Sequence, residues 1–398
     1  MLQLIGVLAF IFALLFSVML HEFGHYLTAK RFGMKVTEFF LGFGKKIWSF
    51  TRGETEFGVK AIPAGGYCRV VGMSAREELA PEDDQRAFYR ATVPQRLITM
   101  GAGSTAHFLF GFILLFILAF GIGTVASSPV IDKVVPCFAA ANSSCDSATN
   151  PTPAQMVGLQ HGDRFIAING KEVTNWDKDI LAVQESPGRP VDLTILRNGE
   201  ELHFTVTPAI QKVNGKILGK LGIQVAIESS LKRNGVADST SFAATNFGEI
   251  FNSSIHSLIS LPAKIPALIK QTLGGAPRDP EGLVGVVGVA QATAQTASDS
   301  RLSWNERIGT FILIVASLNI FVGIFNLLPL LPLDGGHMAV AIADGVRRVW
   351  ARIRRRPEPR PIALETLMPL TIVVFVLFVA LTLLLLAADL FNPVHFNL

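Results

Sequence analysis

The sequence has little charge and few cysteines. Only 17% of its 398 residues are Asp, Glu, Lys or Arg, against about 25% in soluble globular chains. With 3 Cys, the chain cannot be a small disulfide-stapled scaffold. Because 50% of its residues are hydrophobic and 29 are Phe, disordered and collagen-like chains are also excluded. The mean hydropathy of +0.43 and the shortage of charge indicate an integral membrane protein.

Long uncharged runs account for the shortage of charge. A membrane-spanning helix needs about 20 predominantly apolar residues, and four stretches meet this requirement: residues 1–20, 97–130, 308–333 and 366–388. The first stretch could instead be a signal peptide, but it lacks a basic start and a small-residue cleavage site, and its apolar pattern continues to Ala29. We therefore predict an α-helical polytopic membrane protein with about four transmembrane helices.

Basic residues cluster in two loops beside these stretches. Lys and Arg are enriched in residues 30–60 and again in residues 347–360, and short loops of this kind lie on the cytoplasmic side of a membrane. Residues 131–305 and both termini are then expected on the outer side. Since the net charge is only +4, we expect the arginine cluster to face anionic lipid and predict no nucleic-acid partner.

The exported segment contains a β-rich stretch, residues 158–208. A short strand ends at an Asn-Gly turn at residues 169–170, and a hairpin with a second Asn-Gly turn at 198–199 follows. The run 158–170 resembles the core of PDZ domains. Such domains bind peptides by strand addition, whereas a domain that only obstructs access to the membrane would show the same pattern.

Two further features of the exported segment leave alternatives open. Cys137 and Cys145 are separated by a short polar loop, and an oxidising compartment allows either a disulfide or two free thiols there. Cys68 lies on the other side of the membrane and cannot join them. Residues 240–275 carry spaced apolar side chains with little charge, which fits an interfacial amphipathic helix or an ordinary helix packed in a core.

The strongest chemical signal lies in the first apolar stretch. His21, Glu22 and His25 form an H-E-x-x-H pattern. The i, i+4 spacing places both imidazoles on one helix face, where they can share a zinc ion with Glu22 as the general base. Three polar residues at a helix end could instead simply meet the membrane interface. Ionisable groups along a spanning helix are costly, however, unless they are partnered or functional.

A catalytic zinc ion needs a third protein ligand. Glu38, Glu54 and Glu56 are candidates by residue type, but they lie in the basic loop beyond the membrane edge. Asp334 ends the third apolar stretch, in which two prolines are expected to break the helix around a cavity. Because a carboxylate in apolar surroundings needs a positive partner, Asp334 is the better candidate for the third ligand.

Two motifs far apart in the chain combine with the β-rich domain between them: H-E-F-G-H in the first apolar stretch and N-L-L-P-L-L-P-L-D-G-G in the third. In this combination the chain resembles the site-2 protease family of intramembrane zinc metalloproteases, and is most similar to bacterial regulator-of-sigma types with a single PDZ domain. The resemblance implies a zinc ion (Zn2+) bound by His21, His25 and Asp334, with Glu22 as the catalytic base. It also implies that Asn326 holds the substrate or polarises the scissile carbonyl.

Residues 57–70 resemble the membrane-associated β-hairpin of the same family, whose edge receives the unwound substrate. This resemblance implies substrate contacts at Gly65, Gly66 and Tyr67. A strand edge can satisfy the backbone groups that the unwinding of a transmembrane helix releases. The alternative is a structural hairpin that only seals the cavity.

The second apolar stretch departs from the family pattern. Many members carry G-P-x-x-N there, whereas residues 103–107 read Gly-Ser-Thr-Ala-His. No substrate role is transferred to this run. His107 is an imidazole within a span, which fits a hydrogen-bonded structural histidine or a partner of the zinc ligands.

We therefore predict an intramembrane zinc endopeptidase of the bacterial inner (cytoplasmic) membrane that cleaves transmembrane segments of substrate proteins. The family resemblance implies anti-sigma factors as partners, with remnant signal peptides as further candidates. The alternative is a non-catalytic membrane scaffold that holds partners through its PDZ-like domain. The expected parts are an N-terminal membrane part (1–127), a PDZ-like domain (128–212), an extracytoplasmic linker with amphipathic helices (213–305) and a C-terminal membrane part (306–398).

Overall fold

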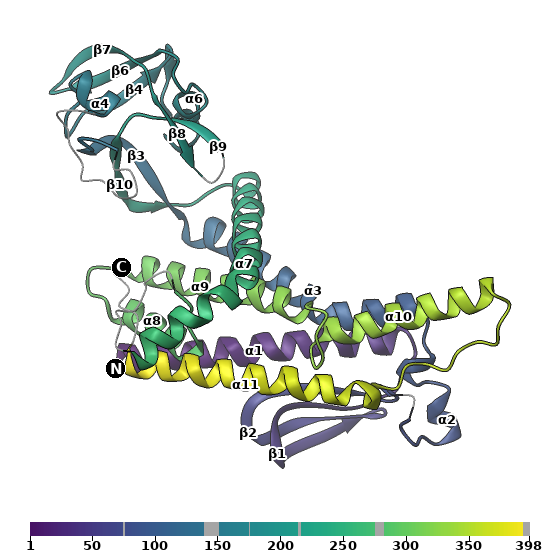
Figure 1. The fold of residues 1–398 in the computed structure, drawn as a ribbon. Coiled ribbons are helices and arrows are strands. Elements are labelled where there is room, and N and C mark those ends of the chain that lie inside the picture. The colour runs from purple at the N-terminus through teal and green to yellow at the C-terminus, as the bar shows by residue number, and fades with distance from the viewer. Residues whose placement is uncertain (75, 139–150, 175, 214–215, 275–281, 393–398) are drawn as a thin grey trace. The chain divides into compact units, whose positions relative to one another are not determined.

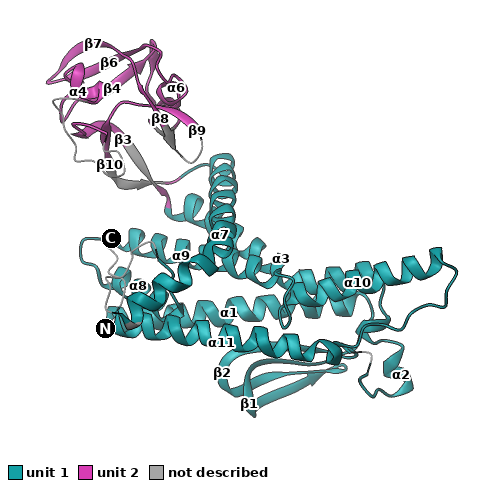
Figure 2. Cartoon of the chain, viewed as in Figure 1, with its two compact units in different colours: residues 1–122, 234–398 teal, residues 123–233 magenta. Residues whose placement is uncertain are grey.

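The computed structural model describes residues 1–74, 76–138, 151–174, 176–213, 216–274 and 282–392 (Figure 1). The chain forms two compact units. Met1–Ile122 and Asn234–Leu398 together make the first, which we call the membrane unit, and Gly123–Arg233 make the second, which we call the β unit (Figure 2). The β unit is thus an insertion within the chain of the membrane unit.

The membrane unit is helical apart from one β-hairpin. Its helices, with short 3-10 and π segments labelled η, are α1 (Leu2–Arg31), α2 (Pro81–Asp84), η1 (Phe88–Arg90), α3 (Val93–Ile117), η2 (Leu118–Ile122), α7 (Val236–Leu273), α8 (Val286–Ser298), α9 (Trp304–Asn326), α10 (Asp334–Ile353), η3 (Leu364–Leu367) and α11 (Met368–Phe391).

Four stretches of the described chain are long and apolar enough to cross a membrane: Leu2–Arg31, Val93–Ile122, Trp304–Asn326 and Leu364–Phe391. This result confirms the prediction of about four candidate transmembrane helices. The start of α1 and the end of α11 lie at the same end of the membrane unit (Figure 1). An even number of crossings requires that arrangement.

Helix α3 packs against α1, α7, α9 and α10. Gly24 allows α1 to approach closely, because a Cβ atom there would lie 2.6 Å from the carbonyl oxygen of Ala102 on α3. Phe108 of α3 makes T-shaped ring contacts with Phe247 and Phe251 of α7. The predicted amphipathic stretch therefore lies largely in α7, one face of which packs against α3. Helices α7 and α8 belong to the membrane unit, where the sequence suggested a separate linker.

An antiparallel hairpin follows α1, with strands β1 (Val36–Arg52) and β2 (Thr55–Val70). Both strands fold back on themselves, since Leu41 pairs with Gly66 on one side and with Val59 on the other. Gly42 sits at the bend with a φ of 86°, and a Cβ atom there would lie 2.6 Å from a carbonyl oxygen of β2. Glycine therefore permits the sharp bend that makes the hairpin compact.

The turn of the hairpin is tied to the helical part of the membrane unit. Glu54 accepts hydrogen bonds from Arg86 at 2.6 and 2.8 Å and also pairs with Lys30 at the end of α1. Hydrogen bonds from Arg86 and Lys30 hold the pKa of the Glu54 carboxyl at about 2, so the contact persists at neutral pH. Elsewhere the hairpin exposes large apolar side chains, with Ile47 69% and Trp48 59% accessible.

The β unit contains a six-stranded sheet with the order β10-β3-β4-β6-β7, in which β5 pairs with β4, and a separate β8-β9 hairpin. Its elements are β3 (Thr124–Val134), α4 (Pro153–Met156), β4 (Arg164–Ile168), β5 (Lys171–Glu172), α5 (Trp176–Asp179), α6 (Leu181–Gln184), β6 (Val191–Arg197), β7 (Glu200–Val206), β8 (Ala209–Val213), β9 (Lys216–Lys220) and β10 (Ile223–Lys232).

Alternating apolar side chains of the sheet form the core of the β unit, with Phe165, Leu193 and Ile195 almost fully buried. Both predicted Asn-Gly turns are confirmed, with positive φ at Asn169 and Asn198. The β unit is longer at both ends than the predicted 128–212 segment, because β3 and β10, its first and last strands along the chain, pair with each other.

The structure gives the state of two cysteines: Cys137 is disulfide-bonded, as one of the two alternatives allowed. Cys68 is a free thiol in β2. Cys145, which the sequence analysis considered as a partner of Cys137, lies outside the described residues.

The helix of the third apolar stretch ends just before the two prolines at which a break was predicted. Helix α9 stops at Asn326, and residues 327–333 form turns before α10 begins at Asp334. Asp334 was expected at the end of the third span and instead opens the next helix. Two prolines explain the break, because each lacks the N–H group that would continue the helix.

Candidate metal centre

Three side chains from two distant helices converge within the membrane unit. His21 Nε2 and His25 Nε2 of α1 lie 3.0 Å apart, and Asp334 Oδ2 of α10 lies 3.1 Å from the first and 3.3 Å from the second. No other group of three or more metal-ligating side chains of this kind occurs in the described part of the chain. Zinc–nitrogen bonds of about 2.0–2.1 Å in tetrahedral geometry place ligand atoms about 3.3 Å apart. The observed spacing therefore suits one zinc ion.

Burial also favours a cation at this place. Asp334 Oδ2 is buried and, among the described residues, has no hydrogen-bond partner, although two imidazoles lie at ion-pair distance. A buried carboxylate oxygen without a partner is costly. A zinc ion bound to the three atoms would satisfy this oxygen and both imidazole nitrogens.

The orientation of His25 is set by the helix packed against it. His25 Nδ1 lies 2.7 Å from the carbonyl oxygen of Thr99 on α3. Since a carbonyl only accepts hydrogen bonds, Nδ1 is the protonated nitrogen, and the lone pair of Nε2 is left for a metal.

Glu22 and the hairpin face one cavity of about 320 Å³. Its wall includes Glu22, His25 and Asp334, together with residues 67–70 of β2 and His337 of α10. The proposed base, two of the proposed ligands and the final residues of β2 thus share one space. A peptide segment in this cavity would meet the carboxylate of Glu22 and the metal-ligating atoms together.

Of the three hairpin residues that were predicted to contact the substrate, one lines this cavity. Tyr67 lines it, and its hydroxyl donates to Glu38 and accepts from Lys60. Gly65 and Gly66 are not among its lining residues; a Cβ atom on Gly66 would instead lie 2.8 Å from the sulfur of Met19 on α1, so Gly66 allows β2 to approach that helix.

Asn326 lies beside a ligand candidate, with its amide nitrogen Nδ2 3.5 Å from His21 Nδ1. The last residue of α9 thus contacts the ring nitrogen of His21 that does not face His25 and Asp334. Helix α9 therefore contributes a side chain to the surroundings of the candidate metal centre.

Comparison with known proteins identifies the family of the chain. The family model described as Peptidase family M50 matches residues 9–363, which include all the converging side chains. The chain belongs to peptidase family M50. The predicted kinship with site-2 proteases is thereby confirmed, and this M50 peptidase is a multi-pass membrane protein.

Curated relatives of the M50 peptidase carry the names of proteases. The zinc metalloprotease Rip1 of Mycobacterium tuberculosis is 34% identical over 98% of each chain. The regulator of sigma-E protease RseP of Salmonella typhimurium is 27% identical and matches 83% of this chain and 88% of its own. The zinc metalloprotease RasP of Geobacillus kaustophilus is 26% identical over 86% and 90%.

Helix α3 supplies two features of the M50 peptidase site that the sequence analysis did not identify, at Thr99 and Gly103, and also His107, for which it left two roles open. The carbonyl of Thr99 orients His25, and Gly103 faces the two imidazoles. His107 lies with its ring centroid 5.0 Å from that of His21, and its Nδ1 is 2.8 Å from Asn319 Oδ1 on α9. The imidazole of His107 is therefore both hydrogen-bonded and adjacent to a ligand candidate.

Gly103 gives a test of the packing around the metal centre. A Cβ atom at this position would lie 2.6 Å from His25 Nε2 and closer still to the ring of His21. We expect Gly103→Ala to displace the imidazoles at a cost of about 1–3 kcal/mol, which lowers zinc affinity by roughly ten- to a hundredfold. Competition with a zinc-selective chelator measures this change.

Gly101→Ala is the matched control on the same helix, because its Cβ would meet only Met338 Cε at 3.9 Å. This variant should keep the zinc affinity of the wild type. Equal affinities in both variants would show that Gly103 does not limit the space around the imidazoles.

Proposed function

We propose that this M50 peptidase is an intramembrane zinc endopeptidase that cleaves transmembrane segments of substrate proteins close to the cytoplasmic side. The convergence of His21, His25 and Asp334 beside Glu22 carries this proposal. His21 precedes the end of α1 at Arg31 by about 15 Å at the helical rise per residue. A site at that depth lies inside the span, toward the side where the basic loops place the cytoplasm.

His21, His25 and Asp334 would hold the zinc ion, and Glu22 would move the proton. Zinc bound there supplies a Lewis acid for the scissile carbonyl and the attacking water. Glu22 takes a proton from that water as its oxygen bonds to the carbonyl carbon, and it then gives the proton to the leaving amine nitrogen as the C–N bond breaks. Asn326 would steady the His21 ring and contact the substrate near the reacting bond.

The hairpin is proposed to receive the substrate. A helix must unwind before its peptide bonds can be hydrolysed, and the released N–H and C=O groups need partners in a lipid environment. Strand addition at the edge of β2, near Gly65, Gly66 and Tyr67, provides them. The exposed Ile47 and Trp48 suit a hairpin that lies at the membrane surface.

The β unit is proposed to be a single PDZ-like domain on the outer side of the bacterial inner membrane. Its Asn-Gly turns and sheet lie where the sequence resembles the PDZ core. It would admit only substrates whose outer domains have been removed, or bind the new C-terminus that such trimming leaves. Because one relative is named a regulator of sigma-E protease, single-span anti-sigma factors are the proposed substrates, and remnant signal peptides are a second class.

A reconstituted cleavage assay tests the proposal. The purified protein in lipid vesicles should cut a single-span membrane protein that lacks its outer domain, and mass spectrometry should place the cut within the transmembrane segment. A zinc chelator should abolish cleavage, and added zinc should restore it. Cleavage confined to an aqueous loop, or cleavage that persists without metal, would contradict the proposal. No cleavage of any span, with zinc bound, would favour the non-catalytic scaffold.

A further inference from the structure

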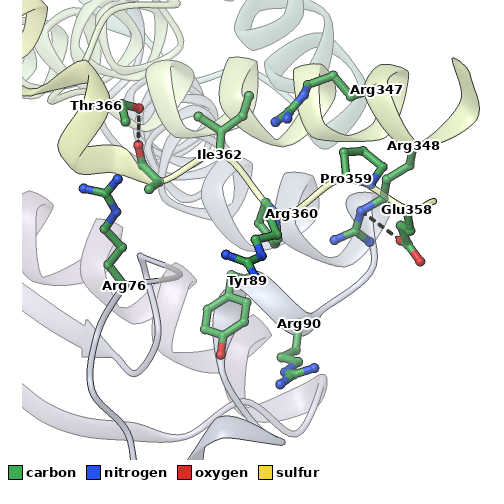
Figure 3. Close-up of a pocket in the computed structure, with 12 residues that line it drawn as sticks. Arg76, Tyr89, Arg90, Arg347, Arg348, Glu358, Pro359, Arg360, Ile362 and Thr366 are labelled. Carbon is green, nitrogen blue, oxygen red and sulfur yellow. Dashed lines mark hydrogen bonds and ion pairs between the residues drawn. The ribbon is translucent and has the colours of Figure 1, made fainter. Parts of the chain in front are cut away.

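An arginine-lined cavity of about 850 Å³ lies in the membrane unit and shares no lining residue with the cavity of the metal centre. Three segments form it: the stretch after the hairpin, the C-terminal half of α10 and the loop that leads to α11 (Figure 3). Its charged lining residues are Arg76, Arg90, Arg347, Arg348, Arg360 and Glu358. The lining of the cavity therefore carries five guanidinium groups and a single carboxylate.

Nearby acids neutralise only part of this charge. Three of the arginines have acidic partners: Arg348 with Glu358, Arg90 with Asp84 and Arg347 with Asp344. Within the described ranges Arg360 makes no hydrogen bond or ion pair, and Arg76 makes no ion pair and only a longer-range interaction with Glu365. The cavity thus keeps at least two guanidinium groups without a counter-charge in contact.

The walls of the cavity are held in place by a buried ion pair. Asp344 of α10 is 2% exposed and lies 3.0 Å from Arg96 of α3. Its second oxygen accepts a hydrogen bond of 2.9 Å from the backbone N–H of Ile362. Because this bond fastens the loop to α10, the position of Arg360 relative to Arg347 and Arg348 is set by the fold.

We infer that this cavity binds a phosphate group. Guanidinium is planar and donates paired hydrogen bonds that match two oxygens of a phosphate, which makes arginine the preferred side chain for such anions. The volume lies within the range of about 300–1,000 Å³ that small-ligand sites occupy. A bound phosphate would supply a counter-charge to Arg76 and Arg360 and would join the loop, α10 and the segment after the hairpin.

The phosphate can come from two sources. Thr366 lines the cavity and lies in η3, the short helix that leads directly into the long apolar helix α11. The cavity therefore opens where a span begins, and a phospholipid headgroup is within reach. A soluble phosphate on the same side would present the same chemistry to the arginines. The inference does not depend on the proposed proteolytic function.

The test replaces the two arginines that lack a contacting acid. Full-length Arg76→Gln/Arg360→Gln protein is compared with wild type and with Arg352→Gln/Arg356→Gln, which removes the same charge from α10 and its loop outside the cavity. One arm measures binding of phosphatidylglycerol from phosphatidylcholine mixed micelles by native mass spectrometry. The other measures binding of inorganic phosphate by calorimetry.

Wild type and the Arg352→Gln/Arg356→Gln control should show saturable binding in at least one arm. The Arg76→Gln/Arg360→Gln variant should bind about tenfold more weakly or worse, with unchanged zinc content. Binding of phosphatidylglycerol alone would identify a lipid headgroup, and binding of inorganic phosphate would identify a soluble source. The inference is overturned if wild type binds in neither arm, or if both double variants lose binding equally.

Discussion

Glu22→Gln is expected to lower the rate of cleavage of a transmembrane substrate by about 10²–10⁴-fold, the range that general acid–base catalysis contributes. The amide keeps the size of the carboxylate but cannot take a proton from water at neutral pH. Since Glu22 does not belong to the three residues whose ligand atoms converge, the zinc content of the variant should stay at the wild-type level. Single-turnover cleavage in lipid vesicles, with zinc measured on the same sample, gives both quantities.

Glu78→Gln is a suitable control for this experiment. Glu78 is exposed and lies outside the cavity that Glu22 lines, so its substitution should leave the rate unchanged. Wild-type activity in Glu22→Gln would remove Glu22 from the mechanism. A loss of zinc in that variant would instead indicate that Glu22 is a ligand.

Asp334→Ala is expected to remove the metal. The substitution deletes the oxygen that lies 3.1 and 3.3 Å from the two imidazole nitrogens and leaves only two protein ligands, where catalytic zinc sites use three. We expect zinc affinity to fall by more than about a hundredfold, since even the loss of groups that merely support ligands costs 10–100-fold. Metal analysis of the purified protein after dialysis against a weak chelator measures this loss.

His337→Ala distinguishes the loss of a ligand from a general disturbance of the cavity. His337 lines the same cavity, three residues after Asp334, but does not belong to the converging group. Its substitution should leave zinc bound. If Asp334→Ala keeps its zinc, or if His337→Ala loses as much, the third ligand has been assigned to the wrong residue.

Much of this molecule could be predicted from local sequence patterns. Membrane spans are set by length and apolarity, so the four candidate helices follow from composition along the chain. The spacing of His21 and His25 places both on one helix face whatever the rest of the fold does. Asp334 was assigned by a physical argument about an acid in apolar surroundings, and the structure places it within 3.3 Å of both imidazoles.

Features that depend on contacts between distant helices could not be predicted in this way. Thr99 orients His25 through its backbone carbonyl. Because every residue carries such a carbonyl, the residue type at position 99 gives no sign of this contact. The need for glycine at position 103 depends on where α1 lies against α3. The break at the two prolines was predicted, but the start of a new helix at Asp334 depends on how the chain turns between residues 327 and 333.

X-ray absorption spectroscopy at the zinc edge tests the central claim most directly. We predict one zinc ion per chain, with only nitrogen and oxygen neighbours at about 2.0–2.2 Å and multiple scattering from two imidazoles. The Asp334→Ala variant should lose this signal. A sulfur neighbour at about 2.3 Å, which the free Cys68 in the same cavity would supply, or zinc that persists unchanged in Asp334→Ala, would contradict a centre formed by His21, His25 and Asp334.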